Sequence, residues 1–440
     1  MRQPVAAPEI AIPGLEWFNV EAPLALSALR GKLVVLDFWT FCCINCMHVL
    51  STLKRIEQRF PREVAVIGIH SPKFAAEREP GNLADALARY GVVHPVVHDP
   101  DFLIWRQYGV RAWPTLVFIA PDGGVIDQVS GEPDPERIVA AVSGMVERAR
   151  AGGVLAPAPL ELKPATAQGG ALAFPGKMKR LEGAGEAAGW ALADGGHHQI
   201  VLLDGSGHER ERVGSGARGF GDGGFREASF DGPQGLAAAP DTLYVADTGN
   251  HAIRKVDLAA GRVTTLAGNG RRGPVLAGAQ AAVAAALASP WDLEVDGDRL
   301  YFANAGSHQL GLLDLGRGTV ERLAGDGDEA IEDGAAATSR LAQPSGLSLS
   351  ADRGILYFVD SETSSVRALR LGPEPYVTTL IGTGLFDFGH VNGDFAGARF
   401  QHPLGLAIMG QRLLVADSYN GALRVLDLGS RRVSDLDDGF

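Results

Sequence analysis

Three cysteines lie within five residues of one another, in the stretch Trp39-Thr-Phe-Cys-Cys-Ile-Asn-Cys46. Cysteines that staple a secreted fold are spread along the chain so that they join distant segments, and these are not. Cys43 and Cys46 have the Cys-X-X-Cys spacing. This spacing is typical of thiol–disulfide exchange, in which one thiolate attacks a disulfide and a second thiol displaces the product.

The elements around the pair favour this chemistry. Leu33–Trp39 is a nearly continuous apolar run, which predicts a buried strand. Residues 42–60 follow with apolar residues at helical spacing, so the cysteines stand where a strand passes into a helix. Unpaired backbone N–H groups at a helix N-terminus stabilise a thiolate. We therefore expect Cys43 to be the exposed attacking thiol and Cys46, one turn further on, to be the buried resolving thiol.

Two further features fit a catalytic role. Asp37 precedes Cys43 by six residues on the predicted strand, where a buried carboxylate could take the proton of the resolving thiol. Trp113-Pro114-Thr115 stands before the predicted strand Leu116–Ile119. A cis proline there would place its backbone beside the disulfide and mark a substrate groove. Asp37 and Pro114 are therefore predicted to act with the cysteine pair.

Other interpretations of the same residues stay open. A zinc site needs about four suitably spaced ligands, and here one Cys-X-X-Cys has only His48 and His70 as weak additional candidates. The domain could also be a redox-silent docking module, with Asp37 a structural buried acid. His70, His94 and His98 are interpreted as packing or surface residues. We predict no metal and no cofactor.

Strand and helix patterns alternate through the first part of the chain, which indicates an α/β layer fold. Residues 151–170 are rich in Ala, Pro and Gly without any period, which is typical of a linker. We predict a first domain over 1–150, a linker over 151–170 and a second domain over 171–440.

The second domain repeats itself. An Asp or Asn with an aliphatic residue six positions later occurs at positions 194, 247, 304, 360 and 417, at intervals of 53 to 57 residues. A second anchor with a central proline precedes the last four. Each unit contains four short strands, and the chain has 57 glycines among 440 residues. Strand-only units of this kind predict a β-propeller. We expect the Asp to bond backbone N–H groups of its own turn, and Arg254, Arg367 and Arg424 to pair with such acids.

These motifs carry a family resemblance. The strand, Cys-X-X-Cys, helix and later Pro-Thr strand resemble the thioredoxin superfamily, in particular its TlpA/DipZ-like branch. The stretch Tyr244–Arg254 resembles an NHL repeat. Together the two halves resemble the NHL-repeat-containing protein 2 family, along nearly the whole chain. The resemblance implies a multidomain architecture, an α/β thioredoxin-like domain followed by an all-β NHL propeller, and a redox or interaction role without a named substrate.

The sequence departs from the family pattern at three points. Cys42 stands where most thioredoxins have tryptophan, and Ile-Asn replaces Gly-Pro between the cysteines, so no redox potential is carried over. We regard Cys42 and Trp113 as possible modulators. The family is expected to close a six-bladed ring, yet five anchors are present. Because Asp437–Phe440 echoes segments that lead into later blades, we expect a missing sixth blade at the C-terminus.

Composition and charge argue against some classes of function. The net charge of −12 argues against a nucleic-acid partner, and no apolar run is long enough for a membrane span. The first residues lack a signal peptide. We therefore expect a cytoplasmic protein. Our leading hypothesis is an oxidoreductase acting on or sensing partner proteins, which the propeller or the thioredoxin groove binds. The alternative is a non-catalytic interaction scaffold. A propeller hydrolase would need a ligand cluster that the repeats do not offer.

Overall fold

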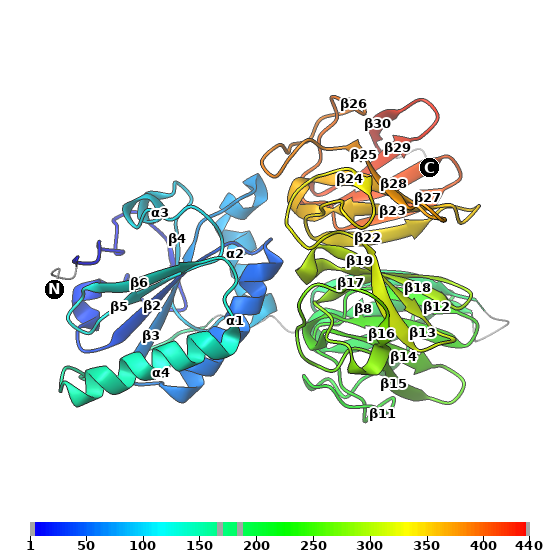
Figure 1. Ribbon diagram of the computed structural model, residues 1–440. Coiled ribbons are helices and arrows are strands. Elements are labelled where there is room, and N and C mark those ends of the chain that lie inside the picture. The colour runs from blue at the N-terminus through cyan, green and yellow to red at the C-terminus, as the bar shows by residue number, and fades with distance from the viewer. Residues whose placement is uncertain (1–4, 165–169, 183–187, 437–440) are drawn as a thin grey trace. The chain divides into compact units, whose positions relative to one another are not determined.

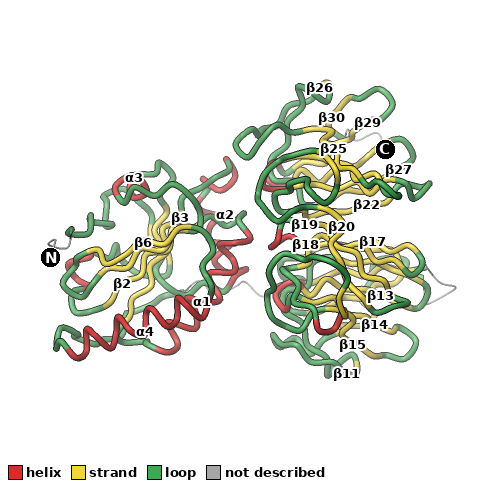
Figure 2. The backbone as a smooth tube through the Cα atoms, viewed as in Figure 1, coloured by secondary structure: helices red, strands yellow, loops and turns green. Residues whose placement is uncertain are grey.

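The computed structural model describes residues 5–164, 170–182 and 188–436. The chain divides into two compact units, residues 1–168 and 169–440, the first with helices and a sheet and the second built of strands (Figures 1 and 2). The predicted fold class is confirmed: a thioredoxin-like α/β unit precedes a five-bladed β-propeller.

The first unit is a six-stranded mixed sheet in the order β1-β4-β3-β2-β5-β6. Strand β2 is central, parallel to β3 and antiparallel to β5, and every residue of β2 is buried. The strands are β1 (Trp17–Phe18), β2 (Leu33–Trp39), β3 (Val64–His70), β4 (Val96–His98), β5 (Thr115–Ile119) and β6 (Val125–Ser130). The helices are α1 (Ile44–Arg59), α2 (Pro80–Tyr90), α3 (Leu103–Gln107) and α4 (Pro135–Ala151).

The two faces of the sheet bury separate apolar cores. Leu33 and Val35 of β2 face α1 and α4, where Leu53 and Val142 meet them. The alternate residues of β2, such as Leu36, face the N-terminal segment and α3. This alternation is the period of two that a strand imposes. It also decides that Asp37 lies on the face that α1 covers.

Part of the predicted linker lies against the first unit. After α4 ends at Ala151, Ala156 N–H donates to the Gly31 carbonyl at 2.8 Å and Lys163 N–H donates to the Asn19 carbonyl at 2.8 Å. Residues 165–169 of the predicted linker lie outside the described residues. Gly31 and Asn19 of the first unit thus hold the predicted linker in place before the chain enters the propeller.

Each later blade is a five-stranded sheet, because a two-residue strand from the preceding loop pairs with the outermost of the four predicted strands. The pairing covers backbone groups that an edge strand would leave open.

In blade one the strands are β7 (Pro175–Leu181), β8 (Gly189–Asp194), β9 (Gln199–Asp204) and β10 (Glu209–Val213). In blade two they are β11 (Gly223–Gly224), β12 (Leu236–Ala239), β13 (Thr242–Asp247), β14 (Ala252–Asp257) and β15 (Arg262–Ala267). In blade three they are β16 (Gln280–Ala281), β17 (Pro290–Asp296), β18 (Arg299–Asn304), β19 (Gln309–Asp314) and β20 (Thr319–Ala324). Blade four has β21 (Gly334–Ala335), β22 (Pro344–Leu349), β23 (Ile355–Asp360), β24 (Ser365–Arg370) and β25 (Tyr376–Ile381). Blade five has β26 (Gly393–Asp394), β27 (Gly405–Met409), β28 (Arg412–Asp417), β29 (Ala422–Asp427) and β30 (Arg432–Asp435).

The anchor acids form the pairs that the repeat predicts, but not the predicted backbone contacts. Arg254 donates to Asp247 at 2.7 Å, and both side chains are fully buried. The backbone N–H bonded to Asp247 belongs to Asp231, sixteen residues earlier, and not to the turn. The prediction of backbone N–H donors from the turn is therefore wrong, and the turn contributes instead the side chain of Asn250, which donates to Asp247 at 2.8 Å. The acid instead fastens the segment that leads into its blade, a contact that only the folded blade creates.

Consecutive blades pack face to face through apolar clusters. Leu310 of blade three is fully buried against blade four, whereas Leu423, the same repeat position in blade five, is 47% exposed. At the opposite end of the row, Met178 of blade one is 52% exposed. The prediction of a sixth blade stays a prediction, and its motif Asp437–Phe440 lies outside the described residues.

This difference in exposure predicts that replacing leucine by alanine lowers the free energy of unfolding more at position 310 than at position 423. Leu310→Ala is expected to lower the free energy of unfolding of the propeller by about 2–4 kcal/mol, because it leaves a cavity in a closed seam. Leu423→Ala is expected to cost less than about 1 kcal/mol. Denaturant unfolding of the two variants of this chain measures both values. Equal losses would show that the blade-five face is covered like the others.

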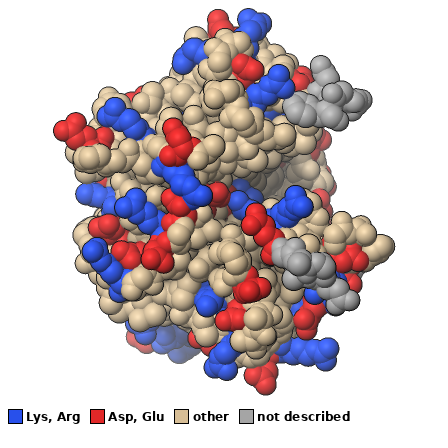
Figure 3. Space-filling view, turned by 90° about the vertical axis from the view of Figure 1, so that its right-hand side faces the viewer, with Lys and Arg blue, Asp and Glu red and all other residues tan. Residues whose placement is uncertain are grey.

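The propeller face in Figure 3 has acidic and basic side chains interspersed, without a broad patch of one sign. Among the described residues, no helix combines the length and the apolar character that crossing a membrane requires. An interspersed surface of this kind lacks the basic footprint of non-specific nucleic-acid binding.

Candidate functional site

The cysteine pair lies where β2 passes into α1. The helix begins at Ile44 with Cys43 as its N-cap residue, two residues later than the sequence predicts for the helix start. Cys43 is half-buried and Cys46 is fully buried in the first turn. All three cysteines are free thiols. The exposure of the pair follows the predicted order, with the first thiol reachable from solvent and the second enclosed.

The Cys46 thiol is held in its protonated form. Burial raises its pKa well above the usual range, and a hydrogen bond and charge from Cys43 and the charge of Asp37 add to this effect. The Thr40 backbone acts in the opposite direction. A thiol in this environment is a poor nucleophile until a base removes its proton.

Asp37 lies on β2 facing the same space. It is fully buried, and burial raises its pKa to about 7, while the charge of His94 acts in the lowering direction. Neither carboxylate oxygen has a hydrogen-bond partner among the described residues. A carboxyl group with a pKa near neutrality can take and return a proton at physiological pH. A carboxyl group that can accept a proton thus shares a buried environment with a thiol that retains one.

The proline segment approaches the same cluster. The Trp113–Pro114 peptide bond is cis. The Trp113 side chain packs with Cys43 against the apolar cluster that contains Cys46 and Trp39, and its ring also meets Trp105 at 4.6 Å between centroids. The fold thus brings together Asp37, Cys43, Cys46 and Trp113 from three separate segments.

Cys42 is held by a residue that sequence analysis did not single out. The Cys42 N–H donates to the Glu77 carboxylate at 2.9 Å, and Glu77 also accepts the N–H groups of Lys73 and Phe74. Glu77 is fully buried. Its sequence neighbourhood is polar and gives no signal of burial. Glu77 thus joins the loop that leads into Cys43, through the Cys42 N–H, to its own segment, through the N–H groups of Lys73 and Phe74.

The histidines interpreted as packing or surface residues are all buried. His98 Nε2 lies 3.0 Å from the Arg78 carbonyl, and its Nδ1 lies 3.0 Å from His70 Nδ1. Burial lowers the pKa of His70 well below its usual range. The charge of His94 acts on Asp37, the buried acid beside the cysteine pair. His94 opens the stretch His94-Pro-Val-Val97, which matches the family named above, but no spacing in the sequence indicates that it lies beside Asp37.

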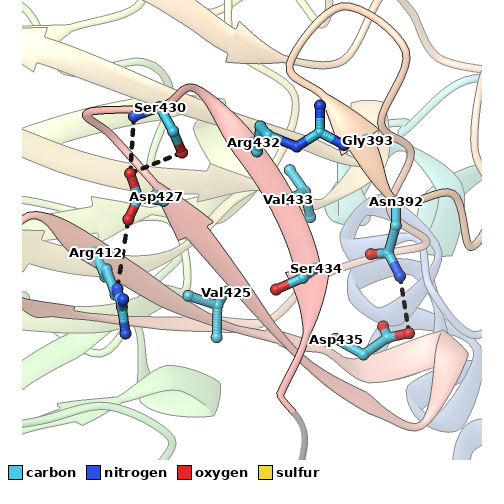
Figure 4. A pocket seen from close by; sticks show the side chains of 10 residues that line it. All are labelled: Asn392, Gly393, Arg412, Val425, Asp427, Ser430, Arg432, Val433, Ser434 and Asp435. Carbon is cyan, nitrogen blue, oxygen red and sulfur yellow. Dashed lines mark hydrogen bonds and ion pairs between the residues drawn. The ribbon is translucent and has the colours of Figure 1, made fainter.

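A pocket in the propeller lies on blade five (Figure 4). Asn392, Arg412, Asp427, Ser430 and Asp435 are among the residues that line it. Asp427 accepts from Ser430 and from Arg412, and Asn392 donates to Asp435. Because these groups bond one another, the pocket offers a ligand few unsatisfied partners.

The acids of the inner strands are also paired. Asp292 meets Lys177 at 2.9 Å and Glu294 meets Lys179 at 2.9 Å. These pairs join the inner strands of blades one and three. They give no converging set of metal or hydrolytic ligands, and the thioredoxin-like unit remains the candidate site.

Known proteins share both halves of this arrangement. Residues 31–125 match the thioredoxin-like family model. The chain is 37% identical to NHL repeat-containing protein 2 of Bos taurus, over 96% of this chain and 62% of the relative. It is 38% identical to the chloroplastic protein SUPPRESSOR OF QUENCHING 1 of Arabidopsis thaliana, over 96% of this chain and 41% of that protein. The first unit alone is 36% identical to protein DipZ of Mycobacterium tuberculosis, over 27% of this chain and 17% of that protein.

The chain thus spans about two fifths to three fifths of the length of these full-length relatives. The TlpA/DipZ-like resemblance of the cysteine motif is consistent with the match to DipZ. The chain is similar, along nearly all of its length, to NHL repeat-containing protein 2, with a thioredoxin-like domain followed by an NHL-type propeller.

Proposed function

We propose that this protein is a thiol–disulfide oxidoreductase that acts on partner proteins through Cys43 and Cys46. The observation that carries the proposal is the half-buried Cys43 at the start of α1, with the protonated Cys46 and the buried Asp37 behind it. A docking module needs no base beside a buried thiol.

Exchange starts at Cys43. Its thiolate attacks one sulfur of a partner disulfide, so that a Cys43–partner disulfide forms and the other partner sulfur leaves as a thiolate. The positive end of the α1 dipole favours negative charge on the Cys43 sulfur. The aromatic side chain of Trp113 lies beside the pair and would contact the incoming polypeptide.

Resolution requires Cys46. Asp37 accepts the Cys46 proton, the Cys46 sulfur attacks Cys43, and the bond between Cys43 and the partner breaks. The enzyme is left with a Cys43–Cys46 disulfide and the partner with two thiols. The reverse sequence oxidises a partner, and the direction depends on the reduction potentials of the two couples.

The propeller is assigned partner recruitment. Propellers present broad surfaces built from loops of several blades, and the relatives that match the whole chain keep both halves. We also retain the prediction of a cytoplasmic location, although one relative is named as a chloroplast protein. The competing proposal, a scaffold with a redox-silent thioredoxin fold, assigns the same recruitment role but no chemistry to the cysteines.

A Cys46→Ser variant separates the two proposals. It is expected to accumulate covalent complexes with partner proteins, because Cys43 attacks and nothing resolves the mixed disulfide. Non-reducing gels of affinity-purified variant measure these complexes, which reducing agent must release. The matched Cys43→Ser variant, with Cys46 intact and buried, is expected to yield none.

The scaffold proposal predicts a different result. If Cys46→Ser forms no mixed disulfide while its Cys43 still reacts with a small alkylating reagent, the oxidoreductase proposal fails. Non-covalent partners retained equally by wild type and both variants would then support the scaffold.

A further inference from the structure

A glycine opens the space beside Asp37. Gly68 of β3 pairs directly with Asp37 of β2, and a Cβ atom added to Gly68 would lie 2.9 Å from Trp39 Nε1 and 3.5 Å from His94 Nε2. Both ring nitrogens therefore lie close to the backbone of β3 at Gly68, next to Asp37. Any larger residue at position 68 would displace them.

The polar atoms around this space are unsatisfied. Both Asp37 oxygens, His94 Nε2 and Trp39 Nε1 are buried and have no hydrogen-bond partner among the described residues. His94 is 3% exposed and Asp37 is fully buried. Buried polar atoms without partners are uncommon, and several facing one space point to a site where protons move. The effect of the His94 charge on Asp37 shows that the two groups are close enough to interact.

The other side of the His94 ring leads to the surface. His94 Nδ1 lies 3.4 Å from Glu57 Oε1 on α1, and the Glu57 side chain is 24% exposed. A carboxylate only accepts hydrogen bonds, so the imidazole N–H is placed at Nδ1 and the lone pair at Nε2, toward Asp37. The backbone here is anchored, since Asn19 donates to the His94 carbonyl at 2.9 Å. The titratable groups facing the space are thus Asp37, Cys46, His94 and Glu57.

We propose that His94, with Glu57 behind it, carries the proton between buried Asp37 and solvent during the resolving step. The inference rests on the proposed thiol–disulfide exchange and adds a route to it. Asp37 takes the proton of Cys46 as the Cys43–Cys46 bond forms. Asp37 then gives a proton to His94 Nε2 through a water molecule in the space that Gly68 leaves open. His94 gives its Nδ1 proton to Glu57, and Glu57 releases a proton to solvent. No electron passes through the relay. Outward transfer leaves the His94 proton on Nε2, and reduction of the Cys43–Cys46 disulfide, which draws a proton inward to Cys46 along the same groups, returns it to Nδ1.

Ellman's reagent separates the two steps in the intact chain. Attack by Cys43 releases a first nitrothiobenzoate, and attack by Cys46 on the Cys43 mixed disulfide releases the second. Stopped-flow absorbance between pH 5.5 and 9 follows both phases, and the Cys46→Ser variant identifies the second by losing it. In wild type the second phase is expected to rise with a midpoint near pH 7, where the Asp37 carboxyl ionises.

His94→Ala is expected to slow the second phase about tenfold at pH 6.5 and to leave the first phase within about twofold. Its midpoint is expected to move to higher pH, because the variant lacks the group that acts to lower the pKa of Asp37. Added imidazole is expected to restore part of the rate. Glu57→Gln, a change near the surface that leaves the core intact, is expected to slow the same phase by a smaller factor. Glu63→Gln, which alters a carboxylate paired with Arg150, is the matched control and is expected to change neither phase.

Each outcome decides the inference. A second phase with the wild-type rate and midpoint in His94→Ala and Glu57→Gln overturns the relay and leaves the exchange proposal intact. A wild-type protein that releases only the first nitrothiobenzoate overturns both. A slower second phase with an unchanged midpoint and no imidazole rescue assigns His94 a packing role and also overturns the relay.

Discussion

Asp37→Asn is expected to slow closure of the Cys43–Cys46 disulfide about a hundredfold or more at pH 7, because the buried Cys46 thiol loses its base. The same substitution is expected to stabilise the fold. The second phase of the Ellman reaction measures the first effect, and denaturant unfolding of the reduced protein measures the second. The combination of lost rate and gained stability is the signature of a group kept for function.

The sign of the stability effect follows from proton linkage. The folded protein holds the Asp37 proton up to a pKa of about 7, whereas the unfolded chain loses it near 3.8. Between these values the folded state binds more protons, so the free energy of unfolding falls as pH rises. The shift corresponds to about 4 kcal/mol above pH 7. Asp37→Asn is therefore expected to add stability at pH 8, and to add little at pH 4.

A second buried aspartate is the control. Asp99 accepts the N–H groups of Leu103 at 2.6 Å and of Trp105 at 2.9 Å, so its carboxylate is satisfied where that of Asp37 is not. Burial also raises the pKa of Asp99, but these N–H groups act in the lowering direction. Asp99→Asn is therefore expected to bring a smaller gain in stability at pH 8 than Asp37→Asn. If Asp37→Asn behaves in the same way, the Asp37 carboxylate has partners in solution and its assignment as an unsatisfied base is wrong.

Arg367→Met is expected to lower the free energy of unfolding of the propeller by about 3–5 kcal/mol. Arg367 and Asp360 meet at 3.0 Å, and both are fully buried. Removing the guanidinium leaves a buried carboxylate without its counter-ion and also frees the Arg340 carbonyl, which Arg367 holds at 2.7 Å. Calorimetry, which resolves the transitions of the two units, measures the loss.

Two companion variants test the cause. Arg370→Met removes an exposed arginine from the same strand and is expected to change the stability by less than about 0.5 kcal/mol. The double variant Arg367→Met with Asp360→Asn is expected to recover part of the loss, because it has no buried carboxylate without a counter-ion. A double variant that is no more stable than Arg367→Met would show that the loss comes from packing of the arginine stem instead.

Blade three shows that the repeat tolerates a neutral version of this pair. Asn304 replaces the aspartate and bonds Ser307 at 2.6 Å, while Gly311 stands where blades two, four and five have arginine. The Phe302 ring would lie within contact distance of any Cβ at Gly311. An apolar ring thus fills the volume that a guanidinium occupies elsewhere, and charge and counter-charge are absent together.

Local patterns were sufficient for the main elements. The apolar run Leu33–Trp39, the helical spacing after Cys43 and the period of the Asp anchors each predict structure from neighbours in sequence, and the structure has these elements. The patterns missed β1, β4 and α3, which have two, three and five residues. Segments this short carry too few residues to show a period.

By itself, the sequence determined the two-part architecture, the number of blades described and the cysteine pair at the start of a helix, because each depends on residues close together in the chain. Only the tertiary structure decided the environment of that pair. Gly68, His94 and Glu57 come from three elements with no common motif, and they meet Asp37 only because β3 pairs with β2 and α1 covers that face. The free energy of a proton on a buried group depends on all the atoms around it, which is a property of packing and not of sequence spacing.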